Sequence, residues 1–307
     1  MSPIFRSHAH RVATIVAAAL IAIAVLGAPV QAQMHDRATQ ARDSSSVSAV
    51  GIASPTHIAR PDSVSGSLFT PRDAIVAGAF VAGTAVMLPF DERLASWFQR
   101  PSLQRSTIAS NVATGARVLG IPGTLIIAPA LYVVGRVGHH EHAADLGLHA
   151  GEALVVALGT TWFIKGIAGR ARPYAVRDTN SYDFAFGRGF SGGEDDSSFP
   201  SGHATAAFAM AAATTAETSR WWPGSARYMA PLLYGSATLV GLSRMYDDKH
   251  WASDVVFGAA IGTFSGWKVV RVNHEHPHNW IDRVFLSAVI APTASGGALL
   301  VWSVRTQ

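Results

Sequence analysis

Long apolar segments, separated by short polar loops, follow one another from Asp73 to about residue 271. Ala, Gly, Leu and Val dominate these segments, and each is long enough for several helical turns. Small residues let helices approach one another closely, so the pattern predicts a helix bundle. The predicted fold class is therefore all-α. We expect about six core helices, near residues 74–89, 108–136, 144–170, 203–217, 228–243 and 251–271.

Two of the predicted helices approach the length that crosses a bilayer. Ala74–Phe90 and Val118–Gly135 carry no charged side chain, whereas His149 and Glu152 interrupt the third segment and Glu217 closes the fourth. Charged residues make up only 14% of the whole chain, well below the share of about a quarter that is usual in globular proteins. The composition favours a membrane-embedded or unusually apolar helical protein.

The last part of the chain differs from the predicted bundle, which we place at residues 73–272. In the tail, residues 273–307, two apolar runs at Val284–Ala291 and Ala298–Val304 flank a segment rich in Gly, Pro, Ser and Thr. Two apolar runs around such a turn are typical of a β-hairpin. A seventh helix fits the same residues, so both alternatives stay open.

The N-terminus has the three-part pattern of a secretory signal. Two arginines precede an apolar run from Val12 to Gly27, and small residues then lead to a cleavage position after Ala32. We interpret residues 1–32 as a signal peptide, with an uncleaved membrane anchor as the alternative. Residues 33–72 are polar and aperiodic, which is typical of a flexible linker. The predicted location is the cell envelope, either periplasmic or membrane-associated.

Lys165 and Arg172 are the first candidates for phosphate binding. They lie seven positions apart, so on one continuous helix they would share a face, and Pro173 would end or bend that helix. An ammonium group and a planar guanidinium group together suit a phosphoryl group. A solvated basic helix end is the alternative for this segment taken alone.

The sequence Pro200-Ser201-Gly202-His203 stands directly before the fourth predicted helix. Pro and Ser favour a helix start, and free N–H groups at a helix N-terminus bind anions. Gly202 allows close approach of a ligand, and His203 is suited to transfer a proton to or from an ester oxygen. An ordinary helix cap beside a surface histidine is the alternative.

A third segment runs from Ser243-Arg244 through His250 to Asp254. His250 and Asp254 stand four positions apart, so on a helix they would meet on one face. A carboxylate beside a histidine fixes its tautomer and favours its positive form. Arg244 adds a third cation. A surface ion pair is the alternative.

Together the three segments resemble the type 2 phosphatidic acid phosphatase and vanadium haloperoxidase superfamily. Its signature is Lys-x6-Arg-Pro, then Pro-Ser-Gly-His, then Ser-Arg-x5-His-x3-Asp, and every fixed position is present within residues 165–254. The match in helical spacing extends the resemblance to about residues 74–271.

The resemblance implies a role for each matching residue. His250 would attack phosphorus and form a phosphohistidine, which Asp254 would orient. His203 would protonate the leaving oxygen and then activate water. Because fixed cations would replace the usual metal ion, no cofactor and no metal are implied. The phosphoryl oxygens would be held by Lys165, Arg172, Ser201, the Gly202 N–H and Arg244.

Several functions remain compatible with this signature. The expected substrate is a phosphate monoester or a lipid phosphate or diphosphate. The alternative activity is that of a vanadium-dependent haloperoxidase that uses the same pocket. The net charge of +4 fits an anionic substrate and a membrane surface equally well, and we expect no nucleic-acid partner. If the signal is cleaved and all six helices span, the site faces the cytoplasm. An exported lipid phosphatase whose site faces outward would need the opposite orientation. We therefore favour an exported bundle that is globular or only membrane-associated.

Two groups of histidines and one acidic segment fall outside the signature. The histidines lie at 139, 140 and 142 and at 274, 276 and 278, and three acids occupy 194–196. We interpret all of them as solvated loop residues, since neither histidine group brings an ordered set of carboxylates. The chain has no cysteine, which excludes disulfides and thiolate metal sites.

Overall fold

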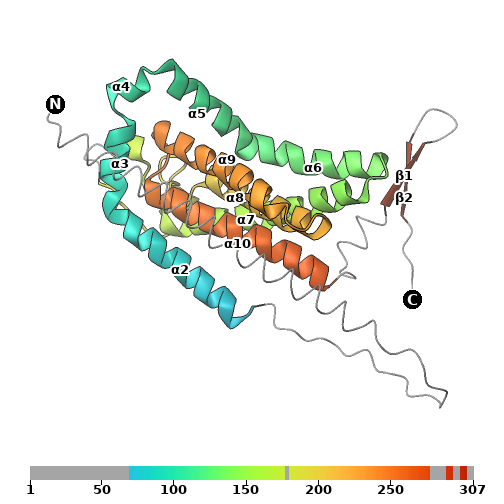
Figure 1. The fold of residues 1–307 in the computed structure, drawn as a ribbon. Helices are drawn as coiled ribbons and strands as arrows, with labels where there is room; N and C mark the ends of the chain where they lie inside the picture. Colours follow the sequence, from blue (N-terminus) through green and yellow to red (C-terminus); the bar gives the residue numbers. More distant parts are fainter. Residues whose placement is uncertain (1–68, 177–179, 277–287, 293–297, 303–307) are drawn as a thin grey trace, which may run out of the picture.

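The computed structural model describes residues 69–176, 180–276, 288–292 and 298–302, and in this part of the chain the predicted all-α bundle is confirmed (Figure 1). The predicted signal peptide and most of the predicted linker lie outside the described residues. Short 3-10 turns occupy Leu88–Phe90, Pro173–Ala175 and Arg188–Phe190. The helices are α2 (Pro71–Met87), α3 (Asp91–Phe98), α4 (Pro101–Gln104), α5 (Thr107–Leu119), α6 (Ile121–Val137), α7 (Glu141–Ala168), α8 (Gly202–Trp221), α9 (Ala226–Tyr246) and α10 (Ala252–Glu275).

Each of the six predicted segments is helical, but the second is divided. Gly120 leaves the helical conformation, and α5 and α6 meet there at an angle of 42°. Pro122 then stands in the first turn of α6, where its missing N–H has no helical partner to lose. The chain also forms α3 and α4, two short helices that the apolar pattern did not predict.

Helix α8 forms the centre of the bundle and packs against α7, α9 and α10. Its contact with α10 runs along Gly258, Gly262 and Gly266, which are spaced one helical turn apart. A Cβ atom at Gly262 would overlap the backbone of Thr205 and Ala209 on α8. Because these glycines have no side chains, the two helices pack closely. The tight contacts also fix their position relative to one another along the helix axes.

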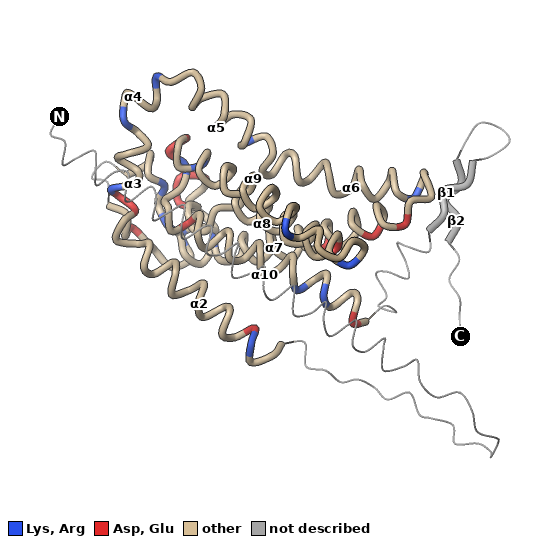
Figure 2. The backbone as a smooth tube through the Cα atoms, viewed as in Figure 1, with Lys and Arg blue, Asp and Glu red and all other residues tan. Residues whose placement is uncertain are grey.

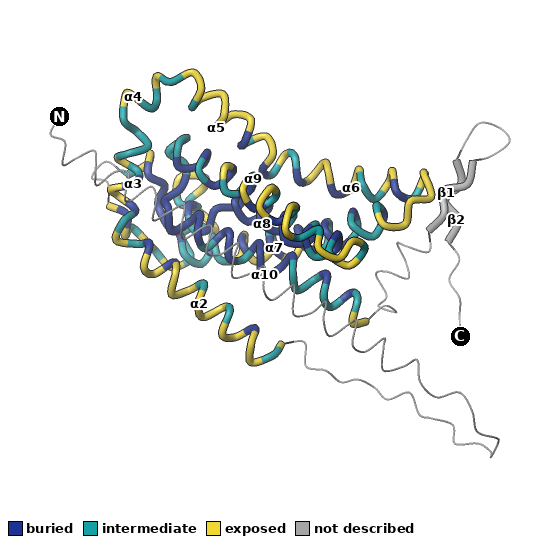
Figure 3. Tube along the Cα trace, in the orientation of Figure 1, coloured by how far each residue is buried: buried dark blue, intermediate teal, exposed yellow. Residues whose placement is uncertain are grey.

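The outer helices carry the apolar surface. Among the described residues, three stretches are long and apolar enough to cross a membrane: Pro71–Phe98, Glu141–Ala168 and Ala252–Glu275. The bent pair α5–α6 would add a fourth if it forms one span. Figure 2 shows acidic and basic residues mainly toward the two ends of the bundle, and Figure 3 shows α2 and α5 largely exposed. These features support association with a membrane.

Two short antiparallel strands lie in the tail, at the place where the sequence left a hairpin and a seventh helix open. Strand β1 (Ala288–Pro292) pairs with β2 (Ala298–Trp302), with Ile290 opposite Leu300. The bundle itself extends slightly beyond its predicted limits, because α2 begins at Pro71 and α10 ends at Glu275. Thr70 caps α2 and sets its start in what the sequence suggested was linker.

Candidate active site

His250 lies in the turn before α10, and Asp254 lies in the first turn of that helix. The expectation that the two share a helical face was wrong, because α10 begins only at Ala252. They come together because Asp254 accepts a hydrogen bond from the Trp251 N–H at 2.9 Å and so folds back over the helix start. Its Oδ2 lies 3.5 Å from Nδ1 of His250. The other ring nitrogen, Nε2, is not the one that faces this carboxylate.

The Asp254 carboxylate is held from both sides. Ser198 donates its hydroxyl to Oδ2 at 2.5 Å, and Arg170 donates Nη1 to Oδ1 at 2.6 Å. Asp254 and Arg170 are both fully buried. A carboxylate that accepts several fixed hydrogen bonds stays ionised and does not rotate, so its position beside the His250 ring is fixed.

Arg170 was not among the predicted site residues, although it stands between Lys165 and Arg172 in the sequence. Its Nη2 donates to Asp91 on α3 at 2.7 Å, and its Nη1 donates to the Ser253 hydroxyl at 2.7 Å. Asp91 in turn accepts from the Ser253 backbone N–H at 2.8 Å. This buried network connects α3 to the start of α10 and supports Asp254 from behind.

Lys165 and Arg172 reach the site from different local structures. Helix α7 ends at Ala168 because Gly169 adopts a left-handed conformation (φ 51°), so the predicted shared helical face was wrong. Lys165 donates to the backbone carbonyls of Ser197 and Ser198, the latter at 3.2 Å. Arg172 lies beyond the helix on an extended segment and is almost fully buried. The loop after Gly169, rather than helical spacing, brings the two cations near each other.

Arg244 lies in the last turn of α9, with only 7% of its side chain exposed. It donates to Asp247 at 2.9 Å, and Arg117 of α5 contacts the same carboxylate oxygen at 3.1 Å. Arg117 was not predicted, since it lies outside the three signature segments. It adds positive charge to the edge of the site.

The predicted helix start at Ser201 is confirmed. The Ser201 hydroxyl accepts the Ala204 N–H at 3.5 Å, so it serves as the cap of α8, and Gly202 is the first helical residue. The Ser201 N–H donates to the Asp254 carbonyl at 3.0 Å, which places the α8 N-terminus beside the start of α10. His203 packs against Gly120, where any Cβ would contact its ring. The break between α5 and α6 therefore makes room for this imidazole.

Both histidines of the site are neutral at neutral pH. Burial lowers the pKa of His250 to about 3, against the opposing effect of Asp254. Burial, followed by the charges of Arg244, Arg172 and Lys165, lowers the pKa of His203 to about 4. Bound phosphate would neutralise these cations, so a proton on His203 becomes more favourable once an anion is present.

Glu194 of the acidic segment is more than a solvated loop residue. Its carboxylate lies 3.2 Å from Arg172 and 3.2 Å from Lys249. The hydrogen bond from Lys249 and the charge of Arg172 lower the pKa of Glu194. With 63% of its side chain exposed, Glu194 is held by these ion pairs and not by surrounding packing.

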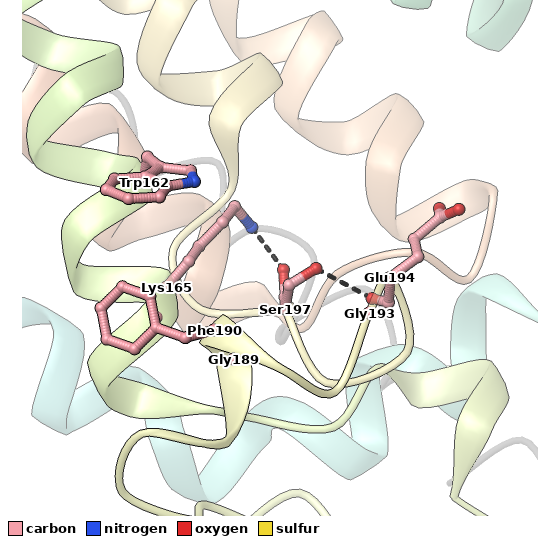
Figure 4. Close-up of a pocket in the computed structure, with 8 residues that line it drawn as sticks. Trp162, Lys165, Gly189, Phe190, Gly193, Glu194 and Ser197 are labelled. Atoms are coloured by element: carbon pink, nitrogen blue, oxygen red, sulfur yellow. Dashed lines mark hydrogen bonds between the residues drawn. The ribbon is translucent and has the colours of Figure 1, made fainter.

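A cavity of about 370 Å³ opens next to Lys165 (Figure 4). Trp162 and Phe190 form an aromatic wall with ring centroids 5.8 Å apart, and both rings are more than half exposed. Ser197 and Glu194 line the polar side. The cavity therefore combines an apolar surface on α7 with a polar edge at the cationic cluster.

Comparisons with known proteins address the family of this chain. The PAP2 superfamily profile matches residues 146–277, a range that contains all eight predicted site residues. This segment, residues 146–277, belongs to the PAP2 superfamily. The structure brings those eight residues to one end of the bundle, and Asp91 and Arg117, which lie outside the matched range, join them there.

Two individual proteins resemble parts of this chain. A lipid A 1-phosphatase from Porphyromonas gingivalis is 37% identical over 90 residues, which cover 28% of this chain and 19% of that protein. The aligned part thus spans about a fifth of the length of the curated relative. The crystal structure of a transmembrane PAP2-type phosphatidylglycerolphosphate phosphatase from Bacillus subtilis is 22% identical. That comparison covers 66% of this chain and 93% of the other, with a TM-score of 0.39.

Proposed function

We propose that this protein is a phosphatase that hydrolyses a lipid phosphate ester through a phosphohistidine on His250. The observation that carries the proposal is the environment of the His250 ring. It is neutral and buried, Asp254 faces one nitrogen, and the charges of Lys165 and Arg172 act on it. A neutral imidazole among fixed cations suits attack on a phosphorus atom whose oxygens carry negative charge.

In the first step, Nε2 of His250 attacks phosphorus and the bond between phosphorus and the ester oxygen breaks. His203 gives its proton to the departing oxygen. In the second step, a water molecule transfers a proton to His203 and attacks phosphorus, and the bond between phosphorus and nitrogen breaks. Inorganic phosphate leaves and His250 is neutral again. Positioning and charge stabilisation supply most of the rate enhancement in such transfers.

The donors at this site suit a metal ion poorly. The groups that face the phosphoryl position are the cations Lys165, Arg172 and Arg244, which would repel a second cation. Asp254 is already bonded to Arg170 and Ser198. We therefore propose that phosphoryl transfer itself needs no metal, because the three side-chain cations supply the positive charge.

Two features favour a lipid over a small soluble ester. The aromatic wall of Trp162 and Phe190 borders the cavity at Lys165, and both side chains lie at the exposed surface of the bundle. Trp162 belongs to α7, one of the helices long and apolar enough to cross a membrane. An acyl chain held against this wall would place its phosphate beside Lys165.

The test compares phosphate release from phosphatidic acid in detergent micelles with release from a soluble phosphomonoester. We expect the lipid to be preferred, and Trp162→Ala to raise KM for the lipid about tenfold while leaving the soluble ester unaffected, since one apolar contact contributes about 1–3 kcal/mol. Trp222→Ala, at an exposed tryptophan beyond the far end of α8, is the control and should change neither KM. Equal effects of Trp162→Ala on both substrates would contradict the lipid proposal.

The pH dependence of kcat/KM should have an acidic maximum, between about pH 4 and pH 6. His250 is neutral above about pH 3 and His203 loses its proton above about pH 4. A phosphate monoester loses its second proton near a pKa of about 6. Above that pH neither free enzyme nor free substrate brings the proton that the leaving oxygen needs, so kcat/KM falls about tenfold per pH unit. This prediction is checked by measuring kcat/KM for a soluble ester from about pH 3 to about pH 8 at constant ionic strength. A kcat/KM that stays flat up to about pH 8 would contradict it.

A further inference from the structure

A second polar cluster lies at the end of the bundle opposite the phosphate site. His149 of α7, Glu217 of α8 and His274 of α10 bring one ligand atom each to within 4.8 Å of one another. Glu217 stands fourteen residues after His203 on the same helix, which corresponds to about 21 Å along the axis. The phosphatase mechanism uses none of these three residues.

The structure corrects our interpretation of the histidines. His274 was expected in a solvated loop, but it lies in the last turn of α10 and contacts a buried carboxylate. His142 likewise lies on α7, where it stacks on Trp221 with ring centroids 4.5 Å apart. His278 lies outside the described residues. Glu217, which seemed only to close a helix, is the ordered carboxylate that the sequence did not reveal.

The two histidines meet at the carboxylate of Glu217. Nδ1 of His149 lies 2.5 Å from Oε1 of Glu217, and Nε2 of His274 lies 3.0 and 2.9 Å from the two carboxylate oxygens. The imidazole rings meet edge to face, with centroids 5.4 Å apart. Glu217 is fully buried and His149 nearly so, whereas 28% of the His274 side chain is exposed. The cluster is thus closed on the inside and reachable from the side of His274.

We propose that His149, Glu217 and His274 form a binding site for a divalent transition metal of the Zn²⁺ class. Two imidazoles and one carboxylate are a ligand set that zinc favours, and such three-ligand sites leave a fourth position for water. Tetrahedral zinc with bonds of about 2.0–2.2 Å separates its ligand atoms by about 3.3 Å. The His–Glu separations of 2.5 and 2.9 Å are shorter than this value, and all three ligand atoms lie within 4.8 Å of one another, so the side chains would rotate apart around the ion.

The surroundings of the cluster hold the ligands in place. Glu152, one turn after His149, accepts a hydrogen bond from Asn273 at 2.5 Å and so ties α7 to α10 beside the cluster. Arg220 on α8 interacts electrostatically with both Glu217 and Glu275. Because the Arg220 guanidinium would repel a metal ion, charge alone does not favour one here. The donor atoms and their geometry support the site instead. The ion would link three helices and so stabilise the folded bundle.

Metal content of the purified full-length chain tests the site without any activity assay. The protein, freed of its affinity tag, is treated with a chelator, incubated with Zn²⁺ and passed through a desalting column before mass spectrometry. We expect about one zinc ion per chain, and less than about a tenth of that in Glu217→Gln and in His274→Ala. His276→Ala, at an exposed histidine two positions after His274, is the matched control and should retain the ion.

Cobalt gives a second measurement. Because the chain has no cysteine, visible bands of bound Co²⁺ would report nitrogen and oxygen ligands in a four-coordinate site. We expect these bands in the wild type and in His276→Ala and their loss in His274→Ala, whose partly exposed side chain makes misfolding of the variant a smaller concern than for Glu217→Gln. Zinc retention by His274→Ala equal to that of the wild type, or absence of stoichiometric zinc from the wild type, would overturn the proposal.

Discussion

Replacing His250 with alanine should lower phosphate release by at least about 10⁴-fold, because the attacking nitrogen is lost and no other neutral imidazole has an ordered carboxylate beside it in the described site. The free energy of unfolding should change much less than the rate of phosphate release. The His250–Asp254 contact is long at 3.5 Å, and Asp254 keeps its bonds to Arg170 and Ser198. The rate is measured as phosphate release with a lipid phosphate and with a soluble ester.

His203→Ala is the informative comparison for this first prediction. This variant should lower the rate of phosphate release from an ordinary alkyl phosphate about 10²–10⁴-fold, because the leaving alkoxide needs a proton. With p-nitrophenyl phosphate, whose leaving oxygen needs none, the first step should recover and a base-stable, acid-labile phosphoenzyme should accumulate. His250→Ala should form no such species with either substrate. Turnover by His250→Ala within tenfold of the wild type would exclude the phosphohistidine mechanism.

The second large effect is expected at Arg170, a residue that contacts no substrate in the proposed mechanism. Arg170→Met removes the cation that stands between the buried carboxylates of Asp91 and Asp254. Loss of one partner from a buried ion pair costs about 3–5 kcal/mol, so the apparent unfolding temperature in detergent should fall clearly. Turnover should fall as well, because Asp254 loses the bond that fixes its orientation toward His250.

A double variant separates the two effects of Arg170. Asp91→Asn added to Arg170→Met removes one of the uncompensated buried charges, so part of the lost stability should return. Turnover should stay low, because the Asp254 carboxylate is still unsupported. Recovery of turnover together with stability would show that Arg170 acts only on folding. Thermal unfolding and phosphate release, measured on the same protein samples, distinguish these outcomes.

The helices were predictable because apolar residues recur with helical spacing over long stretches, and each of the six expected segments is helical. The breaks were harder to predict. Gly120 and Gly169 end helices through their backbone conformations, and the apolar pattern continues across Gly120, whereas Arg170 directly follows Gly169. For the same reason the argument that Lys165 and Arg172 share a helical face failed, although a loop brings both to the site.

The eight predicted site residues could be singled out from the sequence, and the structure gathers them at one end of the bundle, where their catalytic roles stay predictions. Arg170 occupies a variable position of the signature, so only its burial against Asp254 reveals it. Asp91 is 79 residues away from Arg170 in the chain, and nothing local marks it as a partner. Contacts of this kind follow from tertiary packing, which residue spacing does not encode.

The bond between Asp91 and Arg170 also limits how this protein can be divided or recombined. The segment that matches the superfamily, residues 146–277, carries the proposed nucleophile and the proposed phosphate-binding cations but lacks Asp91. A chimera that received only α7–α10 would inherit a buried guanidinium with one of its two counter-charges missing. Grafts between relatives should therefore carry α3 together with the matched segment, and the smallest exchangeable unit is larger than the signature that identifies it.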